Sequence, residues 1–99
     1  MYGLQGKIIA KPGQRDALIA LLLESSRGAG MPGCRLYAVS EVPSEPDAVA
    51  ITEVWDDQAA HDASLTLETV RALIGKARPL IAGMGDSLEL RPVGGQGLD

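Results

Sequence analysis

Aromatic residues are scarce in this sequence. They account for 3% of its 99 residues and include no phenylalanine, although 45% of the residues are hydrophobic. A core built from this composition must consist of aliphatic side chains packed tightly in layers, because the large rings that usually fill protein interiors are nearly missing. The few aromatic residues, Tyr2, Tyr37 and Trp55, are therefore candidates for specific roles.

Cysteine and histidine each occur once, as Cys34 and His61. A single cysteine forms no internal disulfide, and no pair of His or Cys residues has the spacing of metal ligands. These counts argue against an oxidised secreted scaffold and against a zinc site. The glycine-rich stretches follow predicted helices instead of opening them, so they lack the fingerprint of a flavin or nicotinamide site. We expect no cofactor and no metal, and Cys34 to be a small apolar filler.

Clustered basic residues and long apolar runs are also missing. The nine basic residues are scattered between Lys7 and Arg91, and the net charge is -4, so a phosphate backbone would find no basic stripe. The longest apolar run, residues 18–23, is far shorter than the roughly 20 residues that span a bilayer, and no leader pattern opens the sequence. We expect a soluble cytoplasmic protein with no nucleic-acid or membrane partner.

The first half of the chain follows a strand–helix–hairpin pattern. Apolar residues alternate over residues 2–11, and from Gln14 to a stop at Gly28 they recur at the i, i+3, i+4, i+7 positions of an amphipathic helix. Two further strands, residues 34–42 and 48–55, are separated by a turn rich in proline and acidic residues. Two such strands joined by a turn predict a β-hairpin.

The second half predicts a broken helical region and one more strand. Asp56 and Asp57 supply an N-cap, and the helical pattern is interrupted at residues 66–69 before it resumes. Pro79 is expected to bend this helix, and Gly83 or Gly85 to end it. A final strand over residues 87–93 then completes the pattern.

This order predicts one α+β domain, residues 1–93, with a flexible C-terminal tail over residues 94–99. Connections of the βαββαβ type give a ferredoxin-like fold, in which a four-stranded antiparallel sheet carries both helical regions on one face. The other face of the sheet is expected to be too apolar to stay exposed to water. Alternate residues of a strand point to opposite faces, and Ile9 and Val54 add apolar side chains to the face that the helices leave uncovered.

We expect a homodimer in which the open sheet faces of two copies pack together, so that their apolar side chains are shielded from water. Burial of several hundred Å² of apolar surface at about 25 cal/mol per Å² contributes roughly 10 kcal/mol before the costs of association. Glu53 shares its parity with Trp55, so we expect it to face this seam and to pair with Arg35 or Arg91.

A Glu-x-Trp run at residues 53–55, followed by a short acidic turn and an alanine-rich helix, resembles the antibiotic biosynthesis monooxygenase family of dimeric α/β barrels. Lys11-Pro12-Gly13 before the first helix and Pro32-Gly33-Cys34 before the second strand extend the resemblance. The family includes cofactor-independent oxygenases of phenolic or quinol substrates and haem-degrading relatives. The resemblance therefore implies a dimeric α/β barrel that acts as a monooxygenase on a small aromatic quinol or phenol in an apolar cavity.

The resemblance also implies site residues. In the family, a tryptophan matching Trp55 borders the cavity, and a histidine nine residues further on often completes it; here that position is Ser64. His61 lies three residues before Ser64, which places it on about the same side of a helix, and histidine is the side chain best suited to move protons near neutrality. We therefore assign His61 as the catalytic proton acceptor and Trp55, Tyr37 and Ser64 as substrate-binding residues.

Other interpretations of these residues stay open. Trp55 and Tyr37 are also compatible with a packing role, and His61 with a surface or capping role. A dimeric module that binds an apolar metabolite without turning it over is the alternative function. A haem-degrading enzyme ranks last, because Ser64 stands where the axial ligand is expected.

Overall fold

The computed structural model describes residues 1–27 and 31–98 of the chain. Its elements are β1 (Tyr2–Ala10), α1 (Arg15–Arg27), β2 (Cys34–Glu41), β3 (Ala48–Trp55), α2 (Gln58–Ser64), α3 (Glu68–Ala77), a 3-10 turn (Arg78–Leu80) and β4 (Ile81–Leu90). The strands form one antiparallel sheet in the order β2-β3-β1-β4. This arrangement confirms the ferredoxin-like α+β fold with a four-stranded antiparallel sheet.

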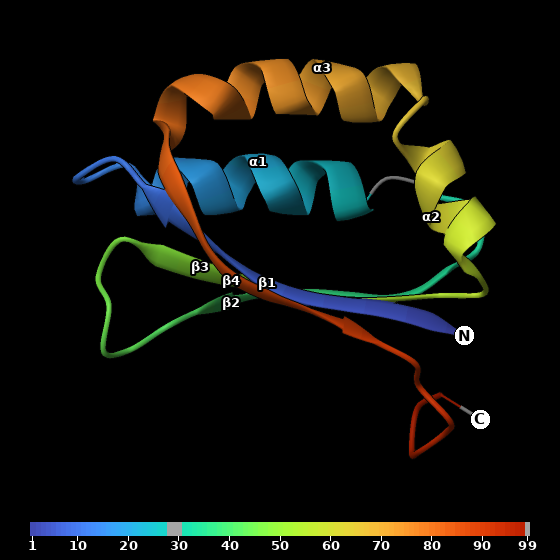
Figure 1. The fold of residues 1–99 in the computed structure, drawn as a ribbon. Coiled ribbons are helices and arrows are strands. Elements are labelled where there is room, and N and C mark those ends of the chain that lie inside the picture. Colours follow the sequence, from blue (N-terminus) through green and yellow to red (C-terminus); the bar gives the residue numbers. More distant parts are fainter. Residues whose placement is uncertain (28–30, 99) are drawn as a thin grey trace.

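Helices α1 and α3 run side by side over one face of the sheet, and α2 lies at the end of the sheet near the N-terminus (Figure 1). The core fills the space between these two layers. Leu18 and Leu22 of α1 are buried against Val49 and Ile51 of β3, and Ala77 closes the cluster from α3. The aliphatic core expected from the composition is therefore present, and no ring lies within this cluster of buried residues.

The second helical region is broken, as the sequence predicts, but its end differs from the prediction. Helix α3 ends at Ala77, and Pro79 lies in the 3-10 turn that follows, because proline has no N–H to continue an α-helix. Gly83 and Gly85 do not end a helix; they lie within β4, which begins at Ile81 instead of residue 87. The predicted end of α1 at Gly28 lies outside the described residues.

A close approach between strands explains the glycine at position 85. A Cβ atom at Gly85 would lie 2.8 Å from Cε and 3.2 Å from Cβ of Lys7 on the neighbouring strand. A larger residue here would make the Lys7 side chain shift, and glycine avoids that contact.

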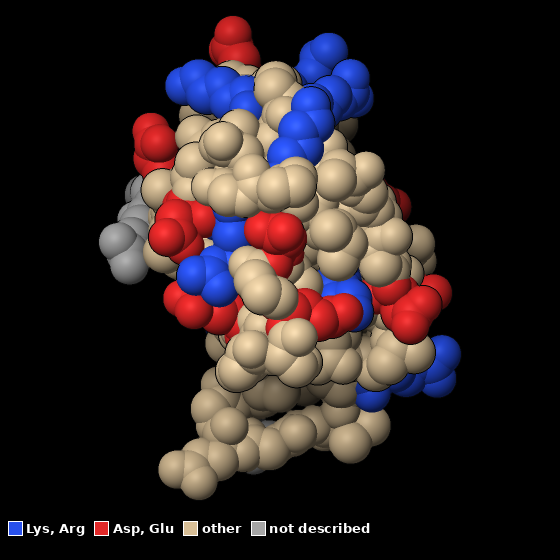
Figure 2. All heavy atoms as spheres, turned by 90° about the vertical axis from the view of Figure 1, so that its left-hand side faces the viewer, with Lys and Arg blue, Asp and Glu red and all other residues tan. Residues whose placement is uncertain are grey.

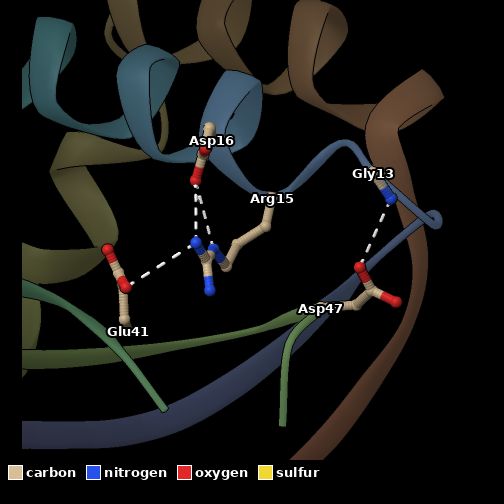
Figure 3. Close-up of polar contacts among 5 residues, drawn as sticks. All are labelled: Gly13, Arg15, Asp16, Glu41 and Asp47. Atoms are coloured by element: carbon tan, nitrogen blue, oxygen red, sulfur yellow. Dashed lines mark hydrogen bonds and ion pairs between the residues drawn. The ribbon is translucent and has the colours of Figure 1, made fainter. Parts of the chain in front are cut away.

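Charged residues gather at the end of the molecule that is remote from α2. The guanidinium of Arg15 lies 3.1 Å from Oδ1 of Asp16 and 3.6 Å from Oε1 of Glu41, and the backbone N–H of Gly13 donates to Oδ1 of Asp47 at 3.4 Å (Figure 3). These contacts join the β1–α1 turn to the β2–β3 hairpin. Figure 2 shows acidic and basic side chains interspersed over this end, which is typical of a solvated surface.

The opposite face of the sheet, which we call the open face, is covered by no described helix (Figure 1). The register places Leu36, Leu88 and Leu90 on this face, and all three are exposed. The C-terminal residues cross one end of it: Pro92 lies against Gly3 of β1, and the carbonyl of Leu98 accepts a hydrogen bond from Nη1 of Arg35 at 3.4 Å. None of the described helices combines the length and the apolarity needed to cross a membrane.

Candidate functional site

The site is built where β3 ends and α2 begins. Trp55, the last residue of β3, is 1% exposed and lies opposite Tyr2 of β1 and Cys34 of β2. Asp57 is the N-cap of α2, as the sequence predicts, and its Oδ1 accepts a hydrogen bond from the backbone N–H of Ala60 at 2.8 Å. This cap starts the helix directly after the strand, so the first turn of α2 lies over the end of the sheet (Figure 1).

His61 is held against the two rings at this end of the sheet. Its imidazole packs edge-on against Trp55, with ring centroids 5.6 Å apart, and is tilted against Tyr2 at 5.5 Å. The side chain is only 16% exposed, and its Nδ1 lies 3.1 Å from Oδ1 of Asp62. Because an ionised carboxylate only accepts hydrogen bonds, the neutral imidazole donates through Nδ1–H and keeps the Nε2 lone pair free to act as a base.

Ser64 supports the turn that carries this histidine. Its hydroxyl donates a hydrogen bond to the backbone carbonyl of His61 at 2.6 Å, and the residue is 5% exposed. The structure thus brings His61 against Trp55, whereas Ser64 is bonded to the backbone of His61 and not to its imidazole.

Glu53 lies on the other side of the sheet from the one expected. It is paired with Leu4 and Tyr37, and it shares the helix-facing side of the sheet with Trp55. Its Oε1 accepts a hydrogen bond from the indole Nε1–H of Trp55 at 3.1 Å. The prediction that Glu53 faces the open face was therefore wrong, and Arg35 pairs with Asp56 instead, at 2.6 Å.

The reason is that alternation shows which residues share a face but not which face it is. In β3 the alternate residues that begin with Val49 point towards α1 and pack on it. The i, i+2 spacing shows only that Glu53 and Trp55 share one side of the strand, and the packing of α1 on Val49 and Ile51 decides which side that is.

Tyr37 lies in the middle of β2, on the helix-facing side and opposite Glu53. Burial, followed by the charges of Glu53 and Cys34, raises the pKa of its phenol to about 12. The hydroxyl therefore stays protonated and can donate a hydrogen bond at neutral pH. It is not the cross-strand partner of Trp55, because that position on β2 belongs to Cys34.

The thiol of Cys34 is kept in its neutral form. Its pKa is raised by burial first and by the charge of Glu53 second, while a backbone hydrogen bond at Leu36 acts in the opposite direction. A thiol that resists ionisation is a poor nucleophile. The role of an apolar filler stays a prediction, since Cys34 is only half-buried.

Tyr2 is a site residue that the sequence did not reveal. Partial burial raises the pKa of its phenol, and the charges of Glu89, Asp62 and Glu53 raise it further. A solvent-open hollow of about 520 Å³ is lined by Met1, Tyr2, Gln58, Glu89, Leu90 and Arg91. Tyr2 thus stands between this hollow and the ring of His61. Only the pairing of β1 with β3 brings it to Trp55, and short-range sequence patterns do not show such a pairing.

No metal centre is evident in the part of the chain that the structure describes. Within residues 1–27 and 31–98, no group of three His, Cys, Asp or Glu side chains could share a metal ion. The polar groups that do converge are one imidazole, two carboxylates and two phenols, those of His61, Asp62, Glu53, Tyr2 and Tyr37. Such a set can bind hydroxyl groups and move protons.

Fold and site together define a ferredoxin-like domain. Its sheet carries a cluster of aromatic rings and carboxylates on the side that the helices cover. The sequence profile of the antibiotic biosynthesis monooxygenase family matches residues 1–76. A Chloroflexus aurantiacus structure named for that family is 52% identical, with a TM-score of 0.92, over 99% of this chain and 98% of the other. The chain belongs to the antibiotic biosynthesis monooxygenase family.

More distant structures named for the same family share the fold. One from Deinococcus radiodurans is 27% identical, covers 96% of this chain and 95% of its own, and has a TM-score of 0.79. Another, from Caulobacter crescentus, is only 18% identical and covers 94% and 90% of the two chains, yet it has a TM-score of 0.85. A search among curated proteins finds no match. At the level of the family, these comparisons support a monooxygenase.

Proposed function

We propose that this protein is a cofactor-independent monooxygenase of a small phenol or quinol, with His61 as the proton acceptor. The proposal rests on the position of the His61 imidazole, which packs on the rings of Trp55 and Tyr2 and has Nδ1 beside the Asp62 carboxylate. A histidine in this setting has one nitrogen committed to a carboxylate and the other available to take a proton.

The reaction needs no reductant besides the substrate. Removal of a phenolic proton by Nε2 of His61 gives an electron-rich phenolate. Attack of a ring carbon on dioxygen gives a peroxide anion, which takes the proton back from His61 and becomes a hydroperoxide. Loss of water from this hydroperoxide leaves a quinone, so one oxygen atom enters the product and the other leaves as water. The protein contributes orientation, exclusion of water and the proton acceptor.

The other predicted site residues keep their roles in this proposal. Trp55 and Tyr37 border the substrate, and the protonated phenol of Tyr37 donates a hydrogen bond to it. Ser64 already donates its own proton to the carbonyl of His61, so its oxygen contacts the substrate only as an acceptor. Trp55 ends β3, Ser64 ends α2, and Tyr37 lies further along β2, opposite Glu53.

The unit that we propose to be active is a homodimer joined through the open face. Support comes from the three exposed leucines on that face, Leu36, Leu88 and Leu90, which a second copy would remove from water. The resemblance to dimeric barrels favours the same arrangement. The single unpaired cysteine fits the reducing cytoplasm, where we place the protein.

Oxygen consumption with a panel of hydroquinones, catechols and phenols tests the activity, with no metal or flavin added. We expect uptake above a heat-treated control, and we expect His61→Gln to lower the rate by about 10² or more, because general-base groups contribute at least that much. Glu68→Gln is the matched control, since it alters an exposed side chain in the first turn of α3.

Two results would contradict the proposal. The first is an absence of oxygen uptake across the whole panel. The second is an unchanged rate in a folded His61→Gln variant. Tight binding of an apolar ligand without turnover, with affinity preserved after His61→Ala, would favour the non-catalytic binding module instead.

A further inference from the structure

Glu53 is a half-buried carboxylate that forms no ion pair with any described side chain. The ion pairs within the described residues join Lys7 to Glu45, Arg15 to Asp16 and Glu41, Arg35 to Asp56, and His61 to Asp62. None of them involves Glu53, although the residue is partly withdrawn from water. A carboxylate in that position is costly unless hydrogen bonds compensate its charge.

Only one oxygen of this carboxylate is engaged within the described part of the chain. Oε1 accepts the indole proton of Trp55 at 3.1 Å, and no described residue donates a hydrogen bond to Oε2. Trp55 is almost completely buried, so its indole fixes the carboxylate in place. Oε2 is thus a fixed acceptor, available to a donor from outside the chain.

The two residues that lie opposite Glu53 in the sheet come from different strands, and neither is charged. Tyr37 of β2 and Leu4 of β1 lie opposite it in the register. The charge of Glu53 contributes to the raised pKa of Tyr37, Tyr2 and Cys34, which shows that its field reaches all three. An aromatic ring with a hydroxyl group suits this setting, because the ring meets apolar surface and the hydroxyl meets the acceptor.

We propose that Oε2 of Glu53 accepts a hydrogen bond from a hydroxyl of a neutral phenol or diphenol that binds beside Trp55 and Tyr37. This inference rests on the proposed function and specifies its substrate as un-ionised when it binds. A diphenol bound in this way has a second hydroxyl for the Nε2 base of His61. The carboxylate rejects a phenolate by charge repulsion, and it rejects an ether because an ether has no proton to donate.

Three ligands test whether the site prefers a neutral hydroxyl group to a phenolate or an ether. All three are compared at one neutral pH, so the protonation of the protein is the same in each measurement. Para-fluorophenol is neutral there, pentafluorophenol is ionised, and para-fluoroanisole lacks the hydroxyl proton. Fluorine NMR and the fluorescence of Trp55, the only tryptophan in the chain, report binding. We expect the wild-type protein to bind para-fluorophenol at least about tenfold more tightly than either of the other two, because a hydrogen bond to a charged group is lost in each case.

Glu53→Gln should change the order of these affinities. The amide oxygen can still accept the proton of Trp55, so packing is preserved, while the amide NH2 becomes a donor. We expect the variant to lose its preference for para-fluorophenol and to bind the phenolate of pentafluorophenol better than the wild type does. Glu68→Gln removes the same charge at an exposed position and should leave all three affinities as they are.

Equal binding of the three ligands by the wild-type protein would overturn the inference, and so would binding of none of them. An unchanged order of affinities in folded Glu53→Gln, judged by circular dichroism, would also overturn it. If that variant does not fold, the wild-type comparison alone still decides. The expected order without any oxygen uptake would leave the Glu53 site standing and reject the monooxygenase, whereas oxygen uptake without that order would do the reverse.

Discussion

Gly33 and Ala60 are in direct contact: a Cβ atom on Gly33 would lie only 2.7 Å from Cβ of Ala60. Gly33 precedes β2 and has φ +82°, a left-handed conformation that glycine adopts without steric cost. Its carbonyl also accepts a hydrogen bond from the backbone N–H of Asp56 at 2.8 Å. The helix that carries His61 therefore rests on this glycine, and the missing side chain sets the distance between α2 and the sheet.

The contact predicts that Gly33→Ala is more harmful than the same change at Gly13. Gly13 also has a left-handed φ, +77°, but a Cβ atom there would meet nothing within 4 Å. We expect Gly13→Ala to cost roughly 1–2 kcal/mol of unfolding free energy from backbone strain alone. Gly33→Ala should cost roughly 3 kcal/mol or more, because the clash with Ala60 adds to the same strain. Urea denaturation of both variants measures the difference, and equal losses would show that α2 moves aside freely.

Trp55 is the next position at which packing and hydrogen bonding can be separated. Trp55→Phe removes the indole donor to Glu53 and part of a fully buried ring, so we expect a loss of roughly 2–4 kcal/mol. Adding Glu53→Leu should restore part of that loss, since it removes the carboxylate whose donor has gone. A double-mutant cycle in urea gives the coupling energy of the pair. Strictly additive losses would mean that the hydrogen bond contributes no measurable stability.

Much of the fold could be predicted from the sequence because most of its signals are local. The alternation, turn residues and Asp57 cap gave β3 its observed bounds and placed the break between α2 and α3. The start of β4 could not be predicted in this way. Gly83 and Gly85 look like helix stops along the chain, and the close approach of Lys7 to Gly85 comes from another strand.

The site was predictable where its members lie close together in the sequence. Trp55 and His61 meet because a strand end and a helix start are joined by a short acidic turn, and Ser64 follows on the same helix. Tyr2 and the orientation of Glu53 depend on which strands pair and on which face the helices cover. These are properties of the assembled sheet, and no short window of sequence contains them.

The phenol of Tyr37 predicts a loss of stability in alkaline solution. Its pKa is about 12 in the folded protein against an ordinary value of 10.0, so the folded state holds the proton more tightly than the unfolded state. The resulting stabilisation is complete below the unfolded value and is lost as the pH rises towards the folded value. A shift of this size corresponds to roughly 2–3 kcal/mol at most.

Comparison with Tyr37→Phe isolates this contribution, because the other ionisable groups are common to both proteins. Urea denaturation from about pH 8 to about pH 11 should show the stability of the wild type falling relative to the variant as the pH rises above about 10. A difference between the two proteins that does not change with pH would mean that the phenol ionises as easily in the folded state as in the unfolded state.

The open face predicts the behaviour of the protein in solution. Leu88 is 58% exposed on that face, opposite Gln5, whereas Met84 of the same strand is 73% exposed and lies opposite Ile8, whose side chain packs on the helix-facing core. If two copies pair through their open faces, Leu88→Asp places a charge in the seam and Met84→Asp does not. We expect a wild-type dimer, an unchanged dimer for Met84→Asp, and self-association weakened more than about tenfold for Leu88→Asp.

Sedimentation velocity over a range of concentrations measures all three proteins. A monomeric wild type would reject the homodimer, and equal dissociation of both variants would place the seam at the β4 edge instead of the open face. Circular dichroism separates loss of pairing from loss of folding. Leu88 lies on the open face, whereas His61 packs on the rings of Tyr2 and Trp55. A folded Leu88→Asp monomer that still binds phenols would therefore show that each subunit carries a complete binding site, and loss of binding together with the dimer would show that the second copy completes it.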